Sequence, residues 1–507
     1  MVSNQINVNK FSKKIIITIL ILGTFLTAFN QTVMSVATPQ VMKDLDVSAA
    51  TAQWLTTAYM LVNGVLVPIT AFLMKRFTTK QLFTSAMFLF LLGSLIAALS
   101  TDFTFLLVGR MVQASGAGIM IPLLYSVVMI LYHPSERGTV MGMVSLAVLS
   151  APAIGPTISG YVIDVLSWHS LFGILVPVSL IVIVLGHFFL ENVTETQKDK
   201  IDLTSMLLST IAFSFILYGF SSAGEMGWTS NIVMISFVVG IISLILFVIR
   251  QLKATNPFLD LKVFKYGTFT LTNIINIGVT IIMYADMILL PIYLQNVLGY
   301  SAMESGVFML PGAVLMAAMS PIAGKLYDLF GAKWITIVGV IITIVSTIPF
   351  IDLSQDTNYY YLLAASTGRR IGMALLLTPI QTAGLNVIPK ELSAHASAIW
   401  NTIRQIAGAI GTSLLITIMT MGSKGYVTDH ASASDSRAQL MLQANIHGIN
   451  IAYFAIIIVA VVSLVLSFWI KERKSLKLCL LTSVENKKLK YLYNLQNSRN
   501  IIVSKNI

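Results

Sequence analysis

The sequence is poor in charged residues and contains almost no cysteine. Only 10% of its 507 residues are charged and a single one is cysteine, whereas 56% are hydrophobic. The mean hydropathy of +0.83 lies far outside the range of soluble proteins, so we expect an integral membrane protein. Because Cys479 stands alone, we expect neither an internal disulfide nor a thiolate metal site.

The sequence also lacks the motifs of several other protein classes. It has no GxxxxGK[ST] phosphate-binding loop, since Gly324-Lys325 is followed by Leu326, and direct ATP coupling is therefore unsupported. No nucleophile has an evident base and no histidines cluster with metal-ligand spacing, which argues against an enzyme. The net charge of +11 could indicate nucleic-acid binding, but the cations lie between apolar segments, so we expect no nucleic-acid partner.

What the sequence has in abundance is apolar segments long enough to cross a bilayer. They predict an all-α integral membrane fold with fourteen transmembrane helices. The first segment follows Lys10, Lys13 and Lys14 and imitates a secretory signal, but its length and the spans that follow indicate an uncleaved helix. The predicted spans are residues 15–38, 54–74, 82–99, 104–131, 139–164, 169–190, 204–223, 231–250, 268–292, 303–324, 334–351, 359–386, 395–420 and 449–470.

Lysines and arginines are distributed very unevenly between the two sides of this predicted bundle. Only Lys43, Lys424 and Arg437 fall on the side opposite the termini, and residues 423–447 are predicted to form a polar loop there. Because positive residues concentrate on the cytoplasmic side of membrane proteins, both termini are predicted to be cytoplasmic. Four arginines fall within the spans themselves: Arg110, Arg369, Arg370 and Arg404.

An internal repeat relates the two ends of the bundle. Residues 68–80 align with residues 321–333, and the same register pairs Leu45-x-x-Ser48-Ala49 with Leu298-x-x-Ser301-Ala302. The seventh and eighth helices are left unmatched between two six-helix halves, as in transporters built from parallel repeats. The predicted organisation is a cytoplasmic N-terminus (1–14), an N-terminal six-helix bundle (15–190), a cytoplasmic linker (191–203), two inserted helices (204–250), a second linker (251–266), a C-terminal six-helix bundle (267–470) and a cytoplasmic tail (471–507).

The fourth and fifth spans carry features that lipid alone would not favour. A lone charge such as Arg110 at bilayer depth costs roughly 2.5–3.5 kcal/mol, so it needs a partner or a function. Small residues recur every fourth position from Ala147 to Ser159, which forms a ridge that another helix can approach closely. Gly155-Pro156 weakens the helix at this ridge, because proline removes a backbone donor. Ordinary packing helices remain an alternative interpretation.

These two spans resemble signatures of the major facilitator superfamily. Gly109-Arg110-x-x-Gln113, running to Gly116, is similar to its fourth-helix signature, and APAIGPTISG at 151–160, which ends at Gly160, is similar to the fifth-helix signature of its antiporters. Four further segments resemble fourteen-helix drug:proton antiporters: residues 29–39, 53–59, 370–386 and 401–408.

The resemblance covers roughly residues 15–470 and looks closest to multidrug and lincomycin-type efflux permeases of bacteria. It implies a major facilitator fold and proton-coupled efflux of amphipathic drugs or toxic compounds across the cell membrane by alternating access. The implied partners are the small-molecule substrate, protons and membrane lipids, with a proton gradient in place of a cofactor and a functional monomer. An exporter of an endogenous metabolite, lipid or nucleotide, an uncoupled facilitator, and a polytopic enzyme or sensor remain alternatives.

Asp286 is the leading candidate for proton coupling, together with Arg110 and Arg370. The resembling antiporters usually have an aspartate at the position of Asn30, and an amide cannot titrate. Asp286 is the only acid within the spans that lies well away from a predicted helix end, and such carboxylates mark proton pathways. A structural carboxylate paired with an interior arginine is the alternative. Since four arginines face one deep acid, we expect weaker handling of dicationic drugs than of neutral or anionic compounds.

Two further groups of residues are candidates. The loop Gly324-x-Leu326-Tyr327-Asp328-x-Phe330-Gly331-Ala332-Lys333 resembles the loop motif of the superfamily, in which Asp328 and nearby cations could hold two helix ends together; a solvated loop is the alternative. The first copy of this motif departs from the family, with Lys75 in place of the acid. Candidate central-cavity residues are Asn30, Gln31, Gln113, Gln381, Asn401 and Arg404, and candidate gating and packing residues are Gly155, Pro156, Gly160, Gly324, Asp328, Gly331 and Lys333.

Overall fold

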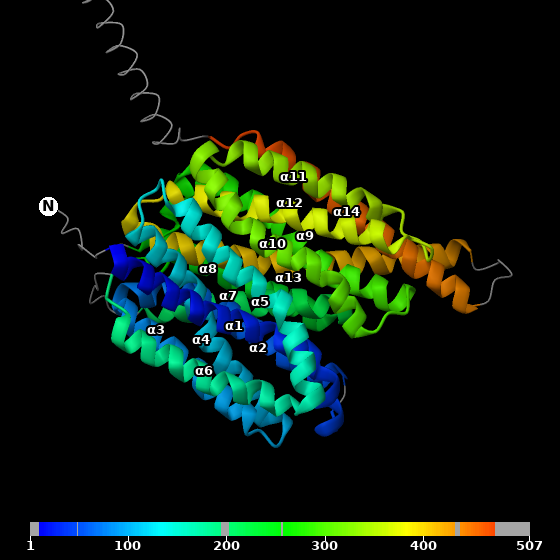
Figure 1. Ribbon diagram of the computed structural model, residues 1–507, viewed down its shortest axis with the longest axis horizontal. Coiled ribbons are helices and arrows are strands. Elements are labelled where there is room, and N and C mark those ends of the chain that lie inside the picture. The colour runs from blue at the N-terminus through cyan, green and yellow to red at the C-terminus, as the bar shows by residue number, and fades with distance from the viewer. Residues whose placement is uncertain (1–9, 48, 194–201, 255–256, 431–436, 472–507) are drawn as a thin grey trace, which may run out of the picture.

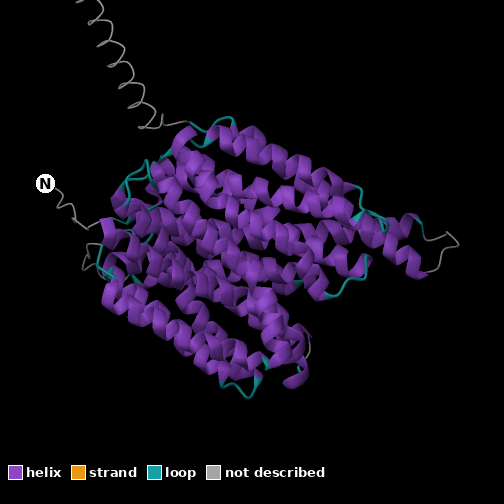
Figure 2. Cartoon of the chain, viewed as in Figure 1, coloured by secondary structure: helices purple, strands orange, loops and turns teal. Residues whose placement is uncertain are grey.

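The computed structural model describes residues 10–47, 49–193, 202–254, 257–430 and 437–471, which form fourteen long α-helices and no strand (Figures 1 and 2). By length and apolar composition, twelve helices among these residues can cross a membrane. The helices are α1 (Lys10–Asp44), α2 (Ala49–Arg76), α3 (Thr79–Ala98), α4 (Phe103–Leu131), α5 (Arg137–Val165), α6 (Trp168–Phe189), α7 (Leu203–Met226), α8 (Asn231–Lys253), α9 (Gly267–Ile292), α10 (Ala302–Phe330), α11 (Lys333–Thr347), α12 (Tyr359–Asn386), α13 (Ser393–Asp429) and α14 (Arg437–Ser467).

Every predicted span coincides with one of these helices, and the largest departure is at the loop predicted over residues 423–447. That prediction was wrong for the described residues, because α13 continues to Asp429 and α14 already begins at Arg437. The ring of Tyr426 stacks on that of His430 at 4.1 Å, and its hydroxyl donates to Gln443 at 2.8 Å. These orange parts of α13 and α14 extend together beyond the other helices at the right of Figure 1. Hydropathy finds the membrane-embedded part of a helix, whereas backbone hydrogen bonding continues through polar sequence.

Helices α1–α6 form one half of the molecule and α9–α14 form the other. The halves meet where α5 packs along α10 and where α2 and α4 pack against α13. Helices α7 and α8 pack against each other, and α7 also contacts α2 and α13, so the inserted pair lies over the junction of the halves. Trp54 of α2 stacks on Tyr218 of α7 with ring centroids 5.8 Å apart. Trp228, between α7 and α8, donates to Thr417 of α13 at 2.7 Å.

A charged clamp holds the start of α7 to the end of α8. Asp202 caps α7 by accepting from the Ser205 N–H at 3.1 Å, and it pairs with Arg250 through bonds of 2.9 Å and 3.1 Å. The hydrogen bond from Arg250, ahead of those from Ser205, lowers the pKa of Asp202 to about 2. A carboxyl with a depressed pKa stays charged down to strongly acidic pH, so this clamp persists throughout the physiological range.

The two halves touch most closely near the end of the bundle at which α1 begins and α14 ends, which we call the terminal end. There α5 and α10 cross through glycines: a Cβ added to Gly324 would overlap the carbonyl oxygen of Gly138. One turn further along α5, a Cβ on Gly142 would lie 2.6 Å from the carbonyl oxygen of Ser320. Small residues therefore bring the two backbones into direct contact.

A second contact at the terminal end offers a direct test of this arrangement. The hydroxyls of Ser126 in α4 and Ser393 in α13 lie 3.5 Å apart and are buried. We expect the double variant S126C/S393C, made in a Cys479→Ser background, to form a disulfide under mild oxidation, because the two side chains face each other at bridging distance. Mass spectrometry of the linked peptides measures the bond.

The matched control for this pair is S115C/S393C, in which one cysteine moves about three helical turns along α4. Ser115 hydrogen-bonds within its own helix, to the carbonyl of Met111 at 3.0 Å, and should not cross-link. Equal cross-linking in both variants would contradict the closed terminal end.

Candidate functional site

Asp286 lies in the interior of the C-terminal half, between two consecutive arginines. Its side chain is 9% exposed, and among the described residues only Asp286 and Asp328 are acids that are buried. The Nη2 of Arg369 donates to Oδ1 of Asp286, and the Nη2 of Arg370 lies 3.3 Å from Oδ2. Helix α9 supplies the carboxylate and α12 supplies both guanidinium groups, so this trio joins two helices through buried charge.

The sequence identified Arg370 as a candidate but missed Arg369, which is the more deeply buried of the two. The side chain of Arg369 is 1% exposed and that of Arg370 is 12% exposed. The guanidinium carbon of Arg369 lies 4.2 Å from the ring centroid of Phe350 and 5.2 Å from that of Tyr453. Cation–π contacts therefore help to solvate a charge that water cannot reach. Consecutive residues of a helix point about 100° apart, so the sequence alone could not show which arginine faces inward.

The N-terminal half buries Arg110 in a comparable place, but with amides in place of the carboxylate. Its Nη1 donates to the carbonyl of Asn30 at 3.3 Å and to the side-chain oxygen of Gln113 at 3.1 Å. Asn30 Nδ2 also donates to Gln113, and Gln113 donates to Ser94. The guanidinium stands 4.3 Å from the ring centroid of Tyr59. Within the described residues no carboxylate pairs with Arg110, so this network differs from the trio of Asp286, Arg369 and Arg370 in having only neutral polar partners.

The remaining candidates on α1 and α5 lie in different surroundings. A Cβ on Gly155 would overlap Thr32 Oγ1, so α1 approaches α5 closely there, whereas nothing lies within 4 Å of such a Cβ on Gly160. Helix α5 runs without interruption through Gly155-Pro156, although the side chain of Pro156 lies outside the described part. Gln31 is half-buried on α1.

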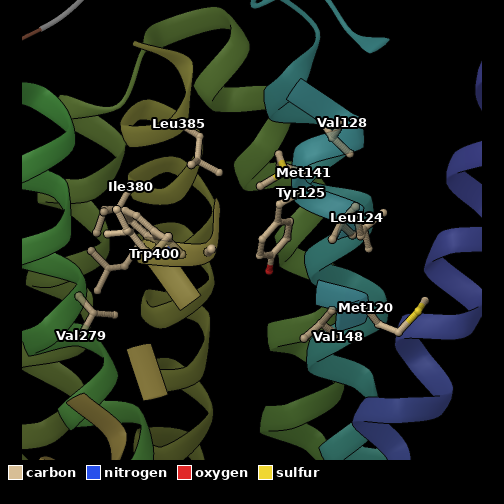
Figure 3. Packing of buried hydrophobic residues seen from close by; sticks show 14 of the residues in the cluster. Met120, Leu124, Tyr125, Val128, Met141, Val148, Val279, Ile380, Leu385 and Trp400 are labelled. Carbon is tan, nitrogen blue, oxygen red and sulfur yellow. The ribbon is translucent and has the colours of Figure 1, made fainter. Parts of the chain in front are cut away.

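A small central cavity lies between the two halves. Its volume of about 20 Å³ has room for about one water molecule. Of the candidate cavity residues, Gln381 and Arg404 line it, while Asn30 and Gln113 belong to the Arg110 network and Asn401 donates to the Ser397 carbonyl of its own helix. Figure 3 shows part of the surrounding packing, with Trp400 and Ile380 of the C-terminal half on one side and Tyr125 and Met141 of the N-terminal half on the other.

Asp328 connects the two halves at the terminal end. Its carboxylate accepts from the backbone N–H groups of Gly138 at 2.9 Å and Thr139 at 2.7 Å, and from the Thr139 hydroxyl at 2.6 Å. The sequence pointed to nearby cations as its partners, whereas these hydrogen bonds come from the first turn of α5. A helix start attracts negative charge because its N–H groups have no partner within the helix. Helix α10 ends at Phe330, and the next residue, Gly331, has a φ of +82°. The Lys333 ammonium lies 5.9 Å from the centroid of the Trp334 ring.

Arg137 is a contact residue of the terminal end that the sequence did not single out. Its guanidinium donates to Asn386 Oδ1 at 2.8 Å and to the carbonyl of Met129 at 2.6 Å. Asn386 in turn donates to the hydroxyl of Tyr327 at 2.9 Å. Helices α4, α5, α10 and α12 are thus tied together on this side, and only the resemblance of residues 370–386 to known exporters signalled Asn386.

Comparison with known proteins places these features in a family. The sequence profile of the Major Facilitator Superfamily matches residues 20–412. The chain belongs to the major facilitator superfamily. It is 46% identical over 402 residues to the "Uncharacterized MFS-type transporter YhcA" of Bacillus subtilis, covering 79% of this chain and 76% of the relative. It is 40% identical over 457 residues to the "Lincomycin resistance protein LmrB" of the same organism, covering 90% and 95%.

Solved structures agree with this assignment at the level of the fold. The MFS proton:xylose symporter XylE, bound to 6-bromo-6-deoxy-D-glucose, superposes with a TM-score of 0.65 over 92% of this chain and 98% of the symporter, at 13% identity. Because the family model and the relatives of 40% identity or more show membership of a transporter family, the chain is a multi-pass membrane transporter of the major facilitator type, not an enzyme, and it carries a small-molecule substrate. Its central cavity lies where the two halves of this major facilitator fold meet.

The buried ion-pair trio makes a prediction about stability. Replacing Arg369 by Met leaves Asp286 with the single, longer contact to Arg370, and removing one partner of a buried pair costs about 3–5 kcal/mol. We expect R369M to lower the unfolding temperature of the purified protein at pH 7 more than R370M does. Thermal unfolding in detergent measures both. In a D286N background, where the carboxylate partner is absent, the R369M change should lower the unfolding temperature much less than it does in the unchanged protein; an equal loss would argue against a direct interaction.

Proposed function

We propose that this transporter exports amphipathic drugs or toxic compounds across the plasma membrane in exchange for protons, by alternating access, and that Asp286 is the proton-binding group. The observation that carries the proposal is the position of Asp286: it is buried within a membrane-spanning helix and held by two arginines. The other buried acid of the described part, Asp328, accepts hydrogen bonds from a helix start at the terminal end and serves to hold the halves together.

Protonation of Asp286 changes the interactions of both arginines at once. A neutral carboxyl no longer attracts Arg369 and Arg370, which then carry unbalanced positive charge between α9 and α12. The two protonation states therefore favour different packing of these helices, and a proton can shift the balance between two conformations only through such a difference. Asp286 lies in the half of α9 that is distant from the terminal end, so its proton would enter from that side.

The contacts at the terminal end correspond to one of the two access states. If the termini are cytoplasmic, as the distribution of lysine and arginine predicts, the Asp328 and Arg137 contacts close the cytoplasmic side. Similarity to a lincomycin resistance protein over nearly the whole length of both chains supports a drug or toxic compound as the substrate. Opening the terminal end then requires breaking the hydrogen bonds that Asp328 accepts from the start of α5, each of which contributes about 0.5–1.5 kcal/mol or somewhat more because the acceptor is charged.

An exporter of an endogenous metabolite, or an uncoupled facilitator, is the second candidate. One observation favours it: among the described interior side chains, Arg110 and Arg404 have no carboxylate partner, so the interior carries more positive than negative charge. A cell interior at negative potential already drives anions outward, and such a substrate would need no exchanged proton.

The decisive experiment reconstitutes the protein in proteoliposomes with an imposed pH gradient and a compound panel that includes lincomycin. We expect the Asp286→Asn variant to lose gradient-driven transport, because an amide cannot bind and release a proton. Exchange of labelled for unlabelled substrate without a gradient should persist, since it needs no net proton movement.

The matched control is Asp356→Asn, which removes an exposed carboxylate between α11 and α12. This variant should behave like the unchanged protein in both assays. If Asp286→Asn still follows the gradient at an unchanged rate, Asp286 is not the coupling group and the second candidate function gains support.

A further inference from the structure

The side chains that line the central cavity divide sharply between the halves. The C-terminal half contributes the amides of Asn276 in α9 and Gln381 in α12 and the guanidinium of Arg404 in α13, together with Trp400, Met283 and Leu377. The N-terminal half contributes Tyr125 and Ser145 together with aliphatic side chains. The polar part of the cavity is therefore carried mainly by one half and stays together when the halves move relative to each other.

Three nitrogen atoms of this cavity are buried and have no hydrogen-bond partner. They are Nδ2 of Asn276, Nε2 of Gln381 and Nε of Arg404. The Thr280 hydroxyl donates to Oδ1 of Asn276 at 3.4 Å, an orientation that leaves the Asn276 NH₂ group unpaired. Each of the three nitrogens is a donor, and a buried donor without an acceptor is destabilising because it has lost its hydrogen bonds to water. Three such donors at one cavity indicate a binding site that is completed by an acceptor group of a ligand.

The charge around the cavity is positive, and like the unpaired donors it favours an acceptor group of a ligand. Within the described residues Arg404 has no carboxylate partner, and the nearby Asp286 is already engaged by two arginines. Met283, which lines the cavity, and Asp286 are three residues apart and share a face of α9. A cation entering the cavity would thus meet Arg404 with no free carboxylate to balance it, whereas a carboxylate would gain charge-assisted hydrogen bonds.

We propose that Asn276, Gln381 and Arg404 form a substrate subsite that binds a hydrogen-bond-accepting oxygen group, with a carboxylate as the best match, and that disfavours cations. This inference rests on the proposed function, since it assigns the substrate class of the same transport pathway. The closed cavity has room for about one water molecule, so the substrate is accommodated only as the halves separate. Because the donors lie on one half, that half keeps hold of the group during the movement.

The test compares two xanthene dyes of similar size and opposite charge, fluorescein and rhodamine 6G. Their binding to the purified protein in nanodiscs is measured by fluorescence polarisation, without any gradient. We expect fluorescein to bind at least about tenfold more tightly than rhodamine 6G, because its carboxylate would accept charge-assisted hydrogen bonds from the cavity donors. Equal binding, or tighter binding of rhodamine 6G, overturns the inference.

Isosteric variants assign the preference to the cavity. Gln381→Glu replaces a donor by an anionic acceptor and should weaken fluorescein binding about tenfold or more while strengthening that of rhodamine 6G. Asn276→Asp should act in the same direction and provides an independent measurement if Gln381→Glu does not fold. Arg404→Gln should weaken fluorescein binding and leave rhodamine 6G unchanged or tighter. If the properly folded variants keep the dye ratio of the unchanged protein, the preference arises elsewhere and the subsite assignment is wrong.

The control variant is Gln443→Glu, which makes the same chemical change on an exposed part of α14. Gln443 accepts from the Tyr426 hydroxyl through its side-chain oxygen, which glutamate retains, so the dye ratio should stay as in the unchanged protein. Failure of the proposed function is distinguishable from failure of the subsite. If the cavity variants change the dye preference but the protein shows no gradient-driven transport, only the proposed proton coupling is wrong. If the protein shows gradient-driven transport but these variants do not affect dye binding, only the subsite assignment is wrong.

Discussion

The structure depends on how the protein solvates positive charge where water is absent. A guanidinium group at bilayer depth is costly unless the protein surrounds it with dipoles, rings or an opposite charge. Both halves place an aromatic ring against the guanidinium group, but they use different polar partners. Arg110 lies against Tyr59 and donates to Asn30 and Gln113, while Arg369 lies against Phe350 and donates to Asp286. Both halves thus bury an arginine against an aromatic ring, and within the described residues only the C-terminal half pairs it with a carboxylate.

The second constraint is the direct backbone contact between α5 and α10. Glycines at positions 138, 142 and 324 let the helices approach until any side chain would overlap the opposite backbone. The attraction between the two backbones is mainly dispersion, which falls steeply with distance, so a small separation of the helices removes most of it. Asp328 of α10 also accepts hydrogen bonds from the backbone N–H groups at the start of α5. Because hydrogen bonds are directional, they fix the relative position of the two helices at the closed terminal end. The rest of each half is continuous helix and is suited to move as a rigid body.

Much of this could be predicted from the sequence, because bilayer thickness and hydropathy determine where helices lie. The fourteen helices, the unmatched inserted pair and the buried position of Asp286 follow from apolar length, the repeat and the scarcity of interior acids. The polar extensions of α13 and α14 were missed because their pairing lies beyond the apolar spans. The choice between Arg369 and Arg370, the contacts of Arg137 and the grouping of Asn276 with Gln381 depend on helix rotation and packing, which one sequence does not specify.

The nearness of the cavity to Asp286 constrains how a proton and a substrate can influence each other. Protonating Asp286 adds positive charge one helical turn from the cavity, so electrostatics alone favours a proton and an anionic group binding together. Linkage is reciprocal, and the bound anion equally favours the protonated carboxyl. Exchange requires the opposite, that each ligand disfavour the other. For an anionic substrate, the proposed antiport would therefore have to act through a change in the packing of α9 and α12. A substrate with a neutral accepting group would not meet this electrostatic opposition.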